Sequence, residues 1–209
     1  GVLIIGATSA IAEECAKQLI SKTKSIFLFG RNKVKLEKIA NDLKVRGIKK
    51  VIYDTFDAEK HSSQAKNMID NVHANIKGFN TAIFSHGSML DQEECEKSIN
   101  QTKNILDINF LSMVSYLIAV SQYFIKQGNG GNIIVISSVA GDRPRISNYI
   151  YGASKAALSF FCDGMNQKLM RYNINILLVK PGFVDTPMTA DIKNKGFLWS
   201  TPEKVSRHI

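Results

Sequence analysis

The sequence predicts an α/β fold, a doubly wound parallel sheet with helices on both faces. Six short apolar runs divide the chain, at residues 2–5, 25–29, 49–53, 80–85, 132–137 and 174–180. Continuous β-branched runs of this kind are typical of parallel strands that are buried on both sides. Helical patterns lie between them, for example over 11–21 and 34–45, and this alternation indicates βαβ crossovers.

The composition indicates one globular domain, residues 1–209, and gives no sign of a metal site. The length suits a single α/β unit, and the hydrophobic share of 44% is ordinary for such a domain. The histidines are not clustered and the cysteines form no CxxC pair, so neither zinc nor a disulfide framework is expected. These residues are His61, His73, His208, Cys15, Cys95 and Cys162. Thiols of this kind suit a reducing, cytoplasmic compartment.

The net charge of +9 comes from scattered basic residues without interleaved aromatics, so nucleic acid is not an expected partner. The charges suit solvated helix faces, or else an anionic cofactor or an anionic substrate at a membrane surface. The longest apolar stretch, residues 110–125, contains too many polar interruptions to predict a membrane span. Association with the cytoplasmic face of a membrane stays open.

The first strand is followed by "GATSAIA", at the edge of the sheet where a doubly wound fold binds its ligand. A strand, a tight turn and a helix start together form a phosphate cradle of free backbone N–H groups. The candidate cradle residues are Gly6, Thr8, Ser9, Ala10 and Ile11. A dinucleotide fingerprint usually has three glycines, whereas Ala10 and Ala12 take the later two positions here. An ordinary strand-to-helix turn is the alternative.

The second strand ends before Arg31, at a position where an acidic residue would bind ribose hydroxyls. A guanidinium grips a 2′-phosphate through two hydrogen bonds. Arg31, with Lys33 and Lys35 nearby, therefore favours NADP(H) over NAD(H). A surface arginine at a helix start is the alternative.

The third strand is followed by a second polar pair. Asp54 is placed to accept a hydrogen bond from an adenine amino group, and Thr55 comes next. The alternative for Asp54 or Asp57 is a helix N-cap.

The fifth strand leads to Ser137 and Ser138, and a predicted helix with Tyr151 and Lys155 follows. A helix places residues i and i+4 on one face, so the Lys155 ammonium lies beside the Tyr151 phenol and favours its ionised form. A phenol with its ordinary pKa of about 10 is a poor acid–base catalyst at neutral pH without such a neighbour. The small residues between the two leave room for a cofactor to lie against the helix.

With these motifs the chain resembles the short-chain dehydrogenase/reductase family of compact, single-domain type. "GATSAIA", "SSVAG", "YGASK" and "KPGFVDTP" occur in the family's order and spacing, and the likeness covers essentially the whole chain. It implies a Rossmann-like domain that transfers a hydride between NADP(H) and a carbonyl or secondary alcohol. "SSVAGDRPRISNYIYGASKAAL" followed by "KPGFVDTPMT" is also similar to the branch of decaprenylphosphoryl-2-keto-ribose reductases, which reduce a keto sugar carried on a polyprenyl phosphate.

The resemblance implies a role for each catalytic residue. Tyr151 is the general acid that protonates the developing alkoxide, and Ser138 holds the carbonyl oxygen. Lys155 lowers the pKa of Tyr151 and bonds the nicotinamide ribose. Asn109 matches the helix asparagine whose backbone carbonyl holds a water of the proton relay. A polar helix residue without a role is the alternative for Asn109.

The residues after the last strand complete the implied cofactor site. Pro181 and Gly182 turn the chain beneath the nicotinamide. By resemblance, the Val184 backbone bonds the carboxamide, and Thr186 reaches the amide or a phosphate.

The fourth strand ends in a departure from the family, which usually has "NAG" where this chain has Ser85, His86 and Gly87. The missing asparagine normally ties neighbouring strands together. Gly87 keeps a close backbone approach to the cofactor. His86 either touches cofactor or substrate, or is a polar loop histidine.

The segment 187–205 governs substrate choice, and its "FLW" at 197–199 indicates an apolar lid or a membrane-facing lip. We expect a small-molecule or lipid-linked carbonyl substrate. A reductase of small or acyl-carrier-linked ketones is one alternative, and a non-catalytic cofactor-binding scaffold is another. The resemblance also implies a homo-oligomer, a dimer or tetramer, and a domain that is C-terminally incomplete, because the chain stops at Ile209 inside a predicted helix that follows Pro202.

Overall fold

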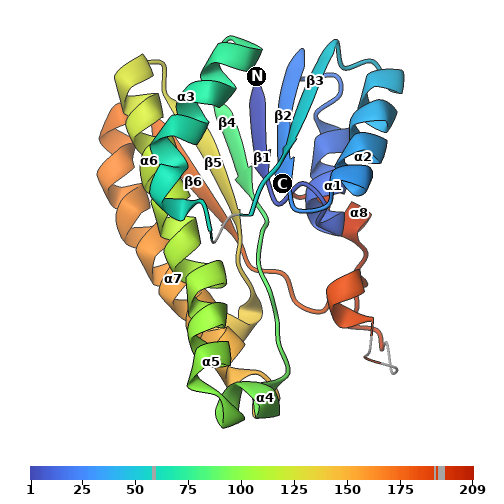
Figure 1. Ribbon diagram of the computed structural model, residues 1–209, viewed down its shortest axis with the longest axis vertical. Coiled ribbons are helices and arrows are strands. Elements are labelled where there is room, and N and C mark those ends of the chain that lie inside the picture. Colours follow the sequence, from blue (N-terminus) through green and yellow to red (C-terminus); the bar gives the residue numbers. More distant parts are fainter. Residues whose placement is uncertain (58–59, 191, 193–195) are drawn as a thin grey trace.

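The computed structural model, which describes residues 1–57, 60–190, 192 and 196–209, has the predicted α/β fold. Over these residues, six strands form one parallel sheet in the order β3-β2-β1-β4-β5-β6 (Figure 1). The strands are β1 (Val2–Ile5), β2 (Ser25–Gly30), β3 (Lys50–Thr55), β4 (Thr81–Phe84), β5 (Gly131–Ile136) and β6 (Ile174–Val179). Every predicted run corresponds to one of them.

Helices cover both faces of the sheet (Figure 1). One face carries α1 (Ala10–Gln18), α2 (Lys33–Val45) and α8 (Pro202–Ser206), and the other carries α3 (Ala65–Ile76), α6 (Ser112–Gln127) and α7 (Tyr149–Leu169). Two helices, α4 (Gln92–Lys97) and α5 (Ile99–Leu106), extend beyond the carboxyl ends of the strands. Short turns are η1 (Ser62–Gln64), η2 (Asp107–Leu111), η3 (Val139–Gly141), η4 (Met170–Tyr172) and η5 (Pro187–Thr189). The helix that begins at Pro202 ends at Ser206, so the last three residues lie outside it, contrary to expectation.

The strands are apolar throughout because each face of the sheet has its own core. Along β1, Leu3 and Ile5 join the core beneath α3, α6 and α7, whereas Val2 and Ile4 join the core beneath α1 and α2. Burial of one such side chain contributes about 1.5–3 kcal/mol. This double burial holds the strand ends, and the loops that follow them, in fixed positions.

One helical stretch must be distinguished from a membrane span. Residues Ile99–Gln127 are, by length and composition alone, long and apolar enough to cross a membrane. In the fold this stretch spans α5, η2 and α6, and 50% of its most apolar window is buried. Tyr116, Leu117, Val120 and Phe124 are fully enclosed in the core that α6 shares with α3. The stretch is therefore a core helix of this domain.

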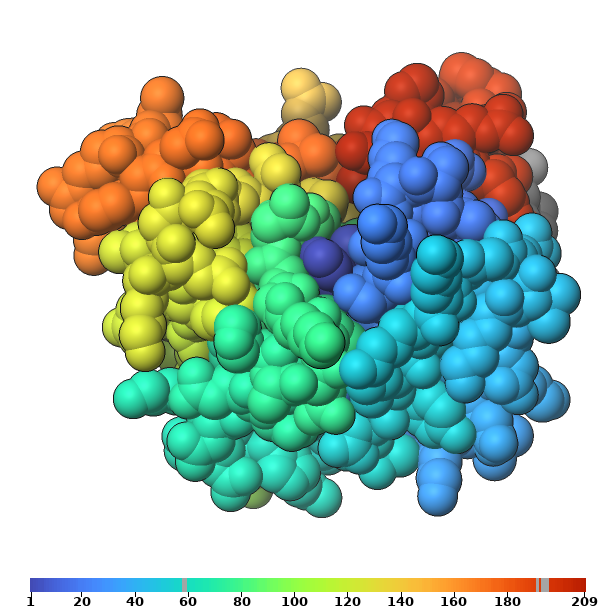
Figure 2. Space-filling model, turned by 90° about the horizontal axis from the view of Figure 1, so that it is seen from above, coloured from blue at the N-terminus to red at the C-terminus, as the bar shows by residue number. Residues whose placement is uncertain are grey.

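Figure 2 shows the molecule from the end at which the strands begin. The first residues, in dark blue, lie near the centre, between the layer with the yellow and orange helices and the layer with the blue helices. The red C-terminal segment lies against the blue segment, in agreement with the packing of α8 on α1. The strands point their carboxyl ends away from this view, toward α4 and α5 in Figure 1.

Candidate active site

A cavity of about 660 Å³ lies where the parallel strands end. The loops after β1, β2, β4, β5 and β6 all contribute to its walls. The predicted site residues that line it are Gly6, Thr8, Ser9, Ala10, Ile11, Arg31, Ser85, Gly87, Ser138, Tyr151, Lys155, Pro181, Gly182, Val184 and Thr186. Residues far apart in the sequence thus meet at one edge of the sheet, as the topology requires.

Asp54 and Thr55, the residues predicted to lie on the adenine side, do not line this cavity, so their contact with a cofactor stays a prediction. Strand β3 runs to Thr55, beyond the predicted end at residue 53, so both residues remain inside the edge strand with exposed side chains. The Asp54 carboxylate accepts a hydrogen bond from the Thr55 backbone N–H, at 2.7 Å. Phe56 and Asp57, which follow the strand, line the cavity instead.

The cradle after β1 has the features of an anion site. Gly6 has a φ of 82°, and a methyl group there would overlap the His86 backbone, so only glycine fits. No described residue accepts a hydrogen bond from the backbone N–H of Thr8, Ala10 or Ile11 at the start of α1. Such free N–H groups and the helix dipole favour a bound phosphate. The residues present therefore fit the pyrophosphate of a dinucleotide.

The alanines of the cradle occupy different environments. Ala12 is fully buried in the core beneath α1, so its methyl group points away from the cavity. Ala10 lines the cavity and begins the helix. The Ser85 hydroxyl donates to the Ser9 hydroxyl at 2.9 Å, which ties the end of β4 to the cradle. This bond takes over a strand-tying role that the sequence analysis found missing.

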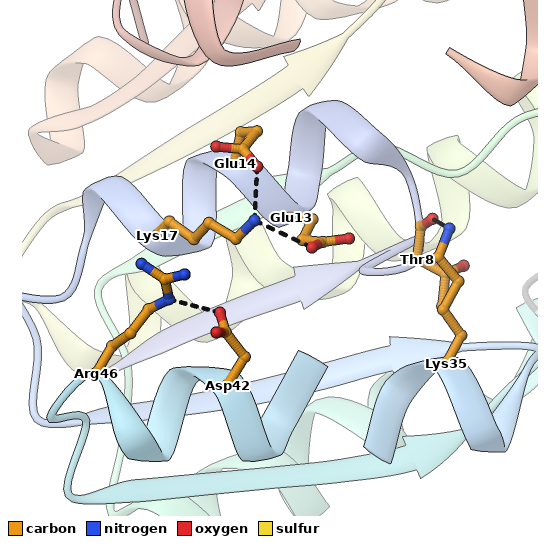
Figure 3. Close-up of polar contacts among 7 residues, drawn as sticks. All are labelled: Thr8, Glu13, Glu14, Lys17, Lys35, Asp42 and Arg46. Carbon is orange, nitrogen blue, oxygen red and sulfur yellow. Dashed lines mark hydrogen bonds and ion pairs between the residues drawn. The ribbon is translucent and has the colours of Figure 1, made fainter. Parts of the chain in front are cut away.

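Two cations border the cradle on the side of β2. The Lys35 ammonium, at the start of α2, donates to the Thr8 carbonyl at 2.7 Å (Figure 3). In the same view Lys17 and Arg46 bind carboxylates, whereas Lys35 binds only a neutral carbonyl. Arg31 is exposed, lines the cavity, and has no ion pair with any residue in the described ranges. The two positive charges therefore remain available to an anion.

The serine and the tyrosine are brought together by very close packing of η3 on α7. A methyl group on Gly152 would lie 2.6 Å from the Ala140 carbonyl oxygen, and one on Gly141 would lie 2.8 Å from the Ala156 nitrogen. Gly152 and Ser154 are buried against protein, and neither lines the cavity. Gly152 and Ser154 thus serve helix packing, whereas Ala153 is exposed. That these small residues leave room for a cofactor stays a prediction.

Burial dominates the electrostatics of this pair. The pKa of Tyr151 is raised above its ordinary value by burial, and a hydrogen bond with Ser138 opposes the rise. Burial lowers the pKa of Lys155 to about 8. The Lys155 ammonium donates to the Ile136 carbonyl at 3.2 Å and lies 5.8 Å from the centre of the Tyr151 ring. The pKa of Tyr151 is thus raised, and the expected lowering of this pKa by Lys155 is not found.

Asn109 lies beside the cavity wall and does not line the cavity. It is fully buried in a π-helical turn, and its amide forms two 2.8 Å bonds with the Ser88 backbone. Its Nδ2 also donates to the Ser154 hydroxyl at 3.1 Å, and Ser154 donates to the Tyr151 carbonyl at 2.6 Å. Asn109 thus links the loop after β4 to the helix of Tyr151. Single π turns inside helices often occur at functional sites.

His86 is neutral and partly enclosed at the cavity wall. Its Nε2 lies 2.9 Å from the Ser112 hydroxyl, which itself donates to the Ile108 carbonyl, so Nε2 carries the proton. Its Nδ1 is buried without a hydrogen-bond partner in the described part of the chain. Burial lowers the pKa of His86 to about 3, and the positive charges of Lys155 and Arg31 contribute to this shift.

The segment after β6 forms a lip over the cavity. Val184 pairs with Ser200 in an isolated bridge, and the rings of Phe183 and Trp199 stack at 5.3 Å. The Arg145 guanidinium lies over Phe183, at 5.0 Å from its ring centre. Sequence reasoning missed Arg145 and Phe183, because only the fold brings their loops together. Of the predicted substrate segment, residues 191 and 193–195 lie outside the described residues.

The described residues contain no group of three histidine, cysteine, aspartate or glutamate side chains that could hold a metal ion. The three cysteines are buried and form no disulfide. Burial raises the pKa of Cys15 and of Cys162 to about 12, so neither thiol is reactive at neutral pH.

Known sequences resemble this chain along most of its length. The sequence profile of the short chain dehydrogenases matches residues 1–196. An uncharacterized oxidoreductase of Staphylococcus epidermidis is 32% identical over 188 residues, which are 90% of this chain and 79% of the relative. An uncharacterized oxidoreductase of Staphylococcus aureus is 28% identical over the same shares.

Solved structures share the fold at lower sequence identity. A short-chain type dehydrogenase/reductase from Mycobacterium marinum has a TM-score of 0.90 at 22% identity, over 99% of this chain and 85% of that one. An actinorhodin polyketide ketoreductase with NADPH has a TM-score of 0.87 at 20% identity, over 99% and 87%. A 3-oxoacyl-[acyl-carrier protein] reductase from Brucella melitensis has a TM-score of 0.83 at 19% identity, over 99% of this chain and 81% of that one.

Proposed function

The chain belongs to the short-chain dehydrogenase/reductase family and is an NAD(P)-dependent oxidoreductase, and we propose that it uses NADP(H) to interconvert a carbonyl group and a secondary alcohol. One observation carries the proposal. Ser138, Tyr151 and Lys155 line the same cavity as a phosphate cradle with free backbone N–H groups. A scaffold that only binds a cofactor needs no such cluster of hydroxyls and a buried ammonium.

In the reductive direction the bound dinucleotide supplies a hydride to the carbonyl carbon. The Ser138 hydroxyl donates a hydrogen bond to the carbonyl oxygen and stabilises the negative charge that develops there. The Tyr151 hydroxyl gives its proton to that oxygen. Because burial raises the pKa of Tyr151, the phenol is protonated at neutral pH and ready to act as an acid. This protonation state is the one that the reductive step requires of Tyr151.

Tyr151 must regain its proton after each turnover. Lys155 is its nearest buried cation, and its pKa of about 8 places it close to the working range of a proton carrier. We assign Lys155 to proton return and to the ribose hydroxyls, and the Asn109 backbone carbonyl to a water between Lys155 and solvent. The amide bonds of Asn109 to Ser88 and Ser154 support this, since they fix the π turn beside the Tyr151 helix.

The preference for NADP(H) rests on Arg31 and Lys35 beside the cradle. Neither forms an ion pair with a carboxylate of the described chain, and Lys35 is held toward the cradle by the Thr8 carbonyl. A 2′-phosphate on the adenosine ribose would neutralise both charges. The actinorhodin ketoreductase of similar fold was solved with NADPH, in agreement with this choice.

Replacement of the proposed acid tests the function. Tyr151→Phe should abolish NADPH-dependent reduction of ketones while NADPH still binds, as followed by cofactor fluorescence. Tyr149→Phe is the matched control, because Tyr149 bonds Glu96 outside the cavity and should retain turnover. Retained turnover in Tyr151→Phe would refute the assignment of the acid.

The substrate is the finer part of the proposal. Met89, Met188 and Leu198 give the cavity an apolar outer part, which suits a lipid-linked carbonyl compound such as a keto sugar on a polyprenyl phosphate. Small or acyl-carrier-linked ketones are the second candidate, supported by the fold similarity to a 3-oxoacyl-[acyl-carrier protein] reductase. Relative kcat/KM for prenyl-phosphate keto sugars and for soluble ketones separates the two candidates.

Assembly and membrane contact also belong to the proposal. Ile99, Leu111, Ile118 and Phe160 expose apolar surface on α5, η2, α6 and α7, which supports a homodimer or homotetramer through these helices. Ile146, Phe197 and Leu198 are exposed next to cavity-lining positions, which supports peripheral contact with the cytoplasmic face of a membrane. Light scattering tests the oligomeric state, and vesicle co-sedimentation tests the membrane contact.

A further inference from the structure

The loop between η3 and α7 places one cation in the substrate end of the cavity. Arg145 lines the same cavity as Ser138 and Tyr151. Its backbone is ordered, because it follows Pro144 and its carbonyl accepts a hydrogen bond from the Asn148 N–H at 3.1 Å. The backbone of Arg145 is therefore anchored in the wall of the cavity that Ser138 and Tyr151 share.

The charge of Arg145 is not neutralised within the described part of the chain. No carboxylate there forms an ion pair with it, whereas the neighbouring Asp142 binds Lys180 at 2.8 Å. A cation in a ligand cavity without a carboxylate partner is suited to an anionic ligand.

The guanidinium lies over the face of an aromatic ring. The Arg145 carbon Cζ lies 5.0 Å from the centre of the Phe183 ring, a cation–π distance. Phe183 in turn stacks on Trp199 at 5.3 Å with an interplanar angle of 19°. A guanidinium stacked by its face keeps its N–H edges available for a bidentate contact with carboxylate or phosphate oxygens.

Apolar side chains lie beside the exposed Arg145 in the cavity wall. Met188 and Leu198, from the lip, line the cavity together with Arg145 and Phe183. The same walls would bind a hydrocarbon part of a ligand.

We propose that Arg145 is an anion subsite of the substrate pocket, and that the substrate is a carbonyl compound with a carboxylate or phosphate group joined to an apolar part. This inference rests on the proposed function, since it takes this cavity to be the substrate site. It adds a specificity residue that lies outside the motifs of the sequence. It predicts that the enzyme prefers negatively charged substrates over neutral ones of similar shape.

A binding experiment tests the subsite without turnover. Trp199 is the only tryptophan of the chain, so its fluorescence reports on the Arg145–Phe183–Trp199 stack. Octyl phosphate and octanoate should change this fluorescence and bind roughly 10- to 100-fold more tightly than octanol, and the difference should shrink with added salt. The anion that binds more tightly shows whether the substrate's charged group is a phosphate or a carboxylate.

Two arginine variants make this test specific. Arg145→Gln should remove the difference between the anions and octanol, and Arg143→Gln, which replaces an exposed arginine outside the cavity wall, should keep it. Equal binding of octanol and both anions to the wild type would overturn the proposal. Unchanged anion affinity in Arg145→Gln would also overturn it.

A turnover experiment separates this inference from the proposed function. A long-chain keto acid and its methyl ester form a matched pair, and the ratio of their kcat/KM values should fall roughly 10- to 100-fold in Arg145→Gln but not in Arg143→Gln. Turnover of both compounds with an unchanged ratio in Arg145→Gln would contradict the subsite while the proposed function stands. In the opposite case, the Arg145→Gln variant would lose the difference in binding between the anions and octanol, while the wild type would reduce no ketone. This result would support the subsite and refute the proposed function.

Discussion

Gly152 of α7 packs against the carbonyl of Ala140 so closely that a methyl group on Gly152 would lie 2.6 Å from that oxygen. This contact seats the turn that follows Ser138 on the helix that carries Tyr151. Gly152→Ala should therefore push the two apart, destabilise the fold by about 1–3 kcal/mol and lower kcat. Urea unfolding and steady-state turnover measure the two effects.

A second glycine of the same helix is the control for this prediction. A methyl group on Gly164 would meet nothing within 4 Å. Gly164→Ala should stabilise the protein by up to about 1 kcal/mol, because alanine favours a helix, and should leave kcat unchanged. Equal stability effects in the two variants would show that contact with Ala140 is not the cause.

Burial of the charged Lys155 should lower the free energy of unfolding at neutral pH. Burial lowers its pKa from 10.5 to about 8, so between these values the unfolded chain binds more protons than the folded one. The stability of the wild type should thus rise with pH through this window. Lys155→Met removes the burial cost and should raise the free energy of unfolding at pH 7 by roughly 1–3 kcal/mol.

The comparison with Lys168→Met, an exposed lysine of the same helix, isolates this effect. The gain in Lys155→Met should shrink as the pH rises toward 10.5, whereas Lys168→Met should differ little from the wild type throughout. Lys155→Met should also weaken catalysis and cofactor binding. A destabilised Lys155→Met variant at pH 7 would contradict the account of its burial.

His86 should make the protein sensitive to acid. Its pKa falls from 6.5 to about 3 on folding, so between these pH values the unfolded chain binds a proton at His86 that the folded protein does not bind. Stability should be lost as the pH falls from about 6.5 toward 3, by about 2 kcal/mol at pH 5. His86→Gln should flatten this dependence.

His208→Gln, at an exposed histidine, should keep the acid dependence of the wild type. Unfolding of the three proteins by urea at pH 5 and pH 7.5 supplies the comparison. A wild type with equal stability at both values would show that His86 is charged or accessible in the folded state.

Arg31 should decide between the two nicotinamide cofactors. Arg31→Asp replaces a cation at the cavity wall by an anion and should weaken NADPH binding by roughly 10- to 100-fold while NADH binding holds or improves. Lys33→Asp changes a nearby exposed charge outside the cavity wall and should have little effect. Fluorescence titrations of both variants with both cofactors measure the preference, and an unchanged preference in Arg31→Asp would exclude a contact with the 2′-phosphate.

The sheet could be predicted from the sequence because its signal is local. Parallel strands buried on both faces require continuous apolar runs, and each run corresponds to a strand. The cavity residues after β1, β4, β5 and β6 followed from the same reasoning, because strand ends share one edge. The third strand was predicted to end at residue 53, whereas β3 runs to Thr55, because its end depends on its pairing with β2, which no local pattern shows.

Tertiary contacts account for the rest. Arg145 and Phe183 meet across loops that only the topology joins, so no motif could pair them. The low pKa of Lys155 follows from complete enclosure, which spacing along a helix does not reveal. The small size of Gly152 was predicted to serve a cofactor, whereas its neighbour is the Ala140 carbonyl.

The most direct measurement is a fluorescence titration of the wild-type protein with NADPH and with NADH. The free N–H groups of the cradle, with Arg31 and Lys35 beside them, predict that NADPH binds at least about tenfold more tightly than NADH. Equal binding of both would contradict the role of these cations. No binding of either would contradict the cradle itself, and with it the proposal that this cavity is the site of hydride transfer.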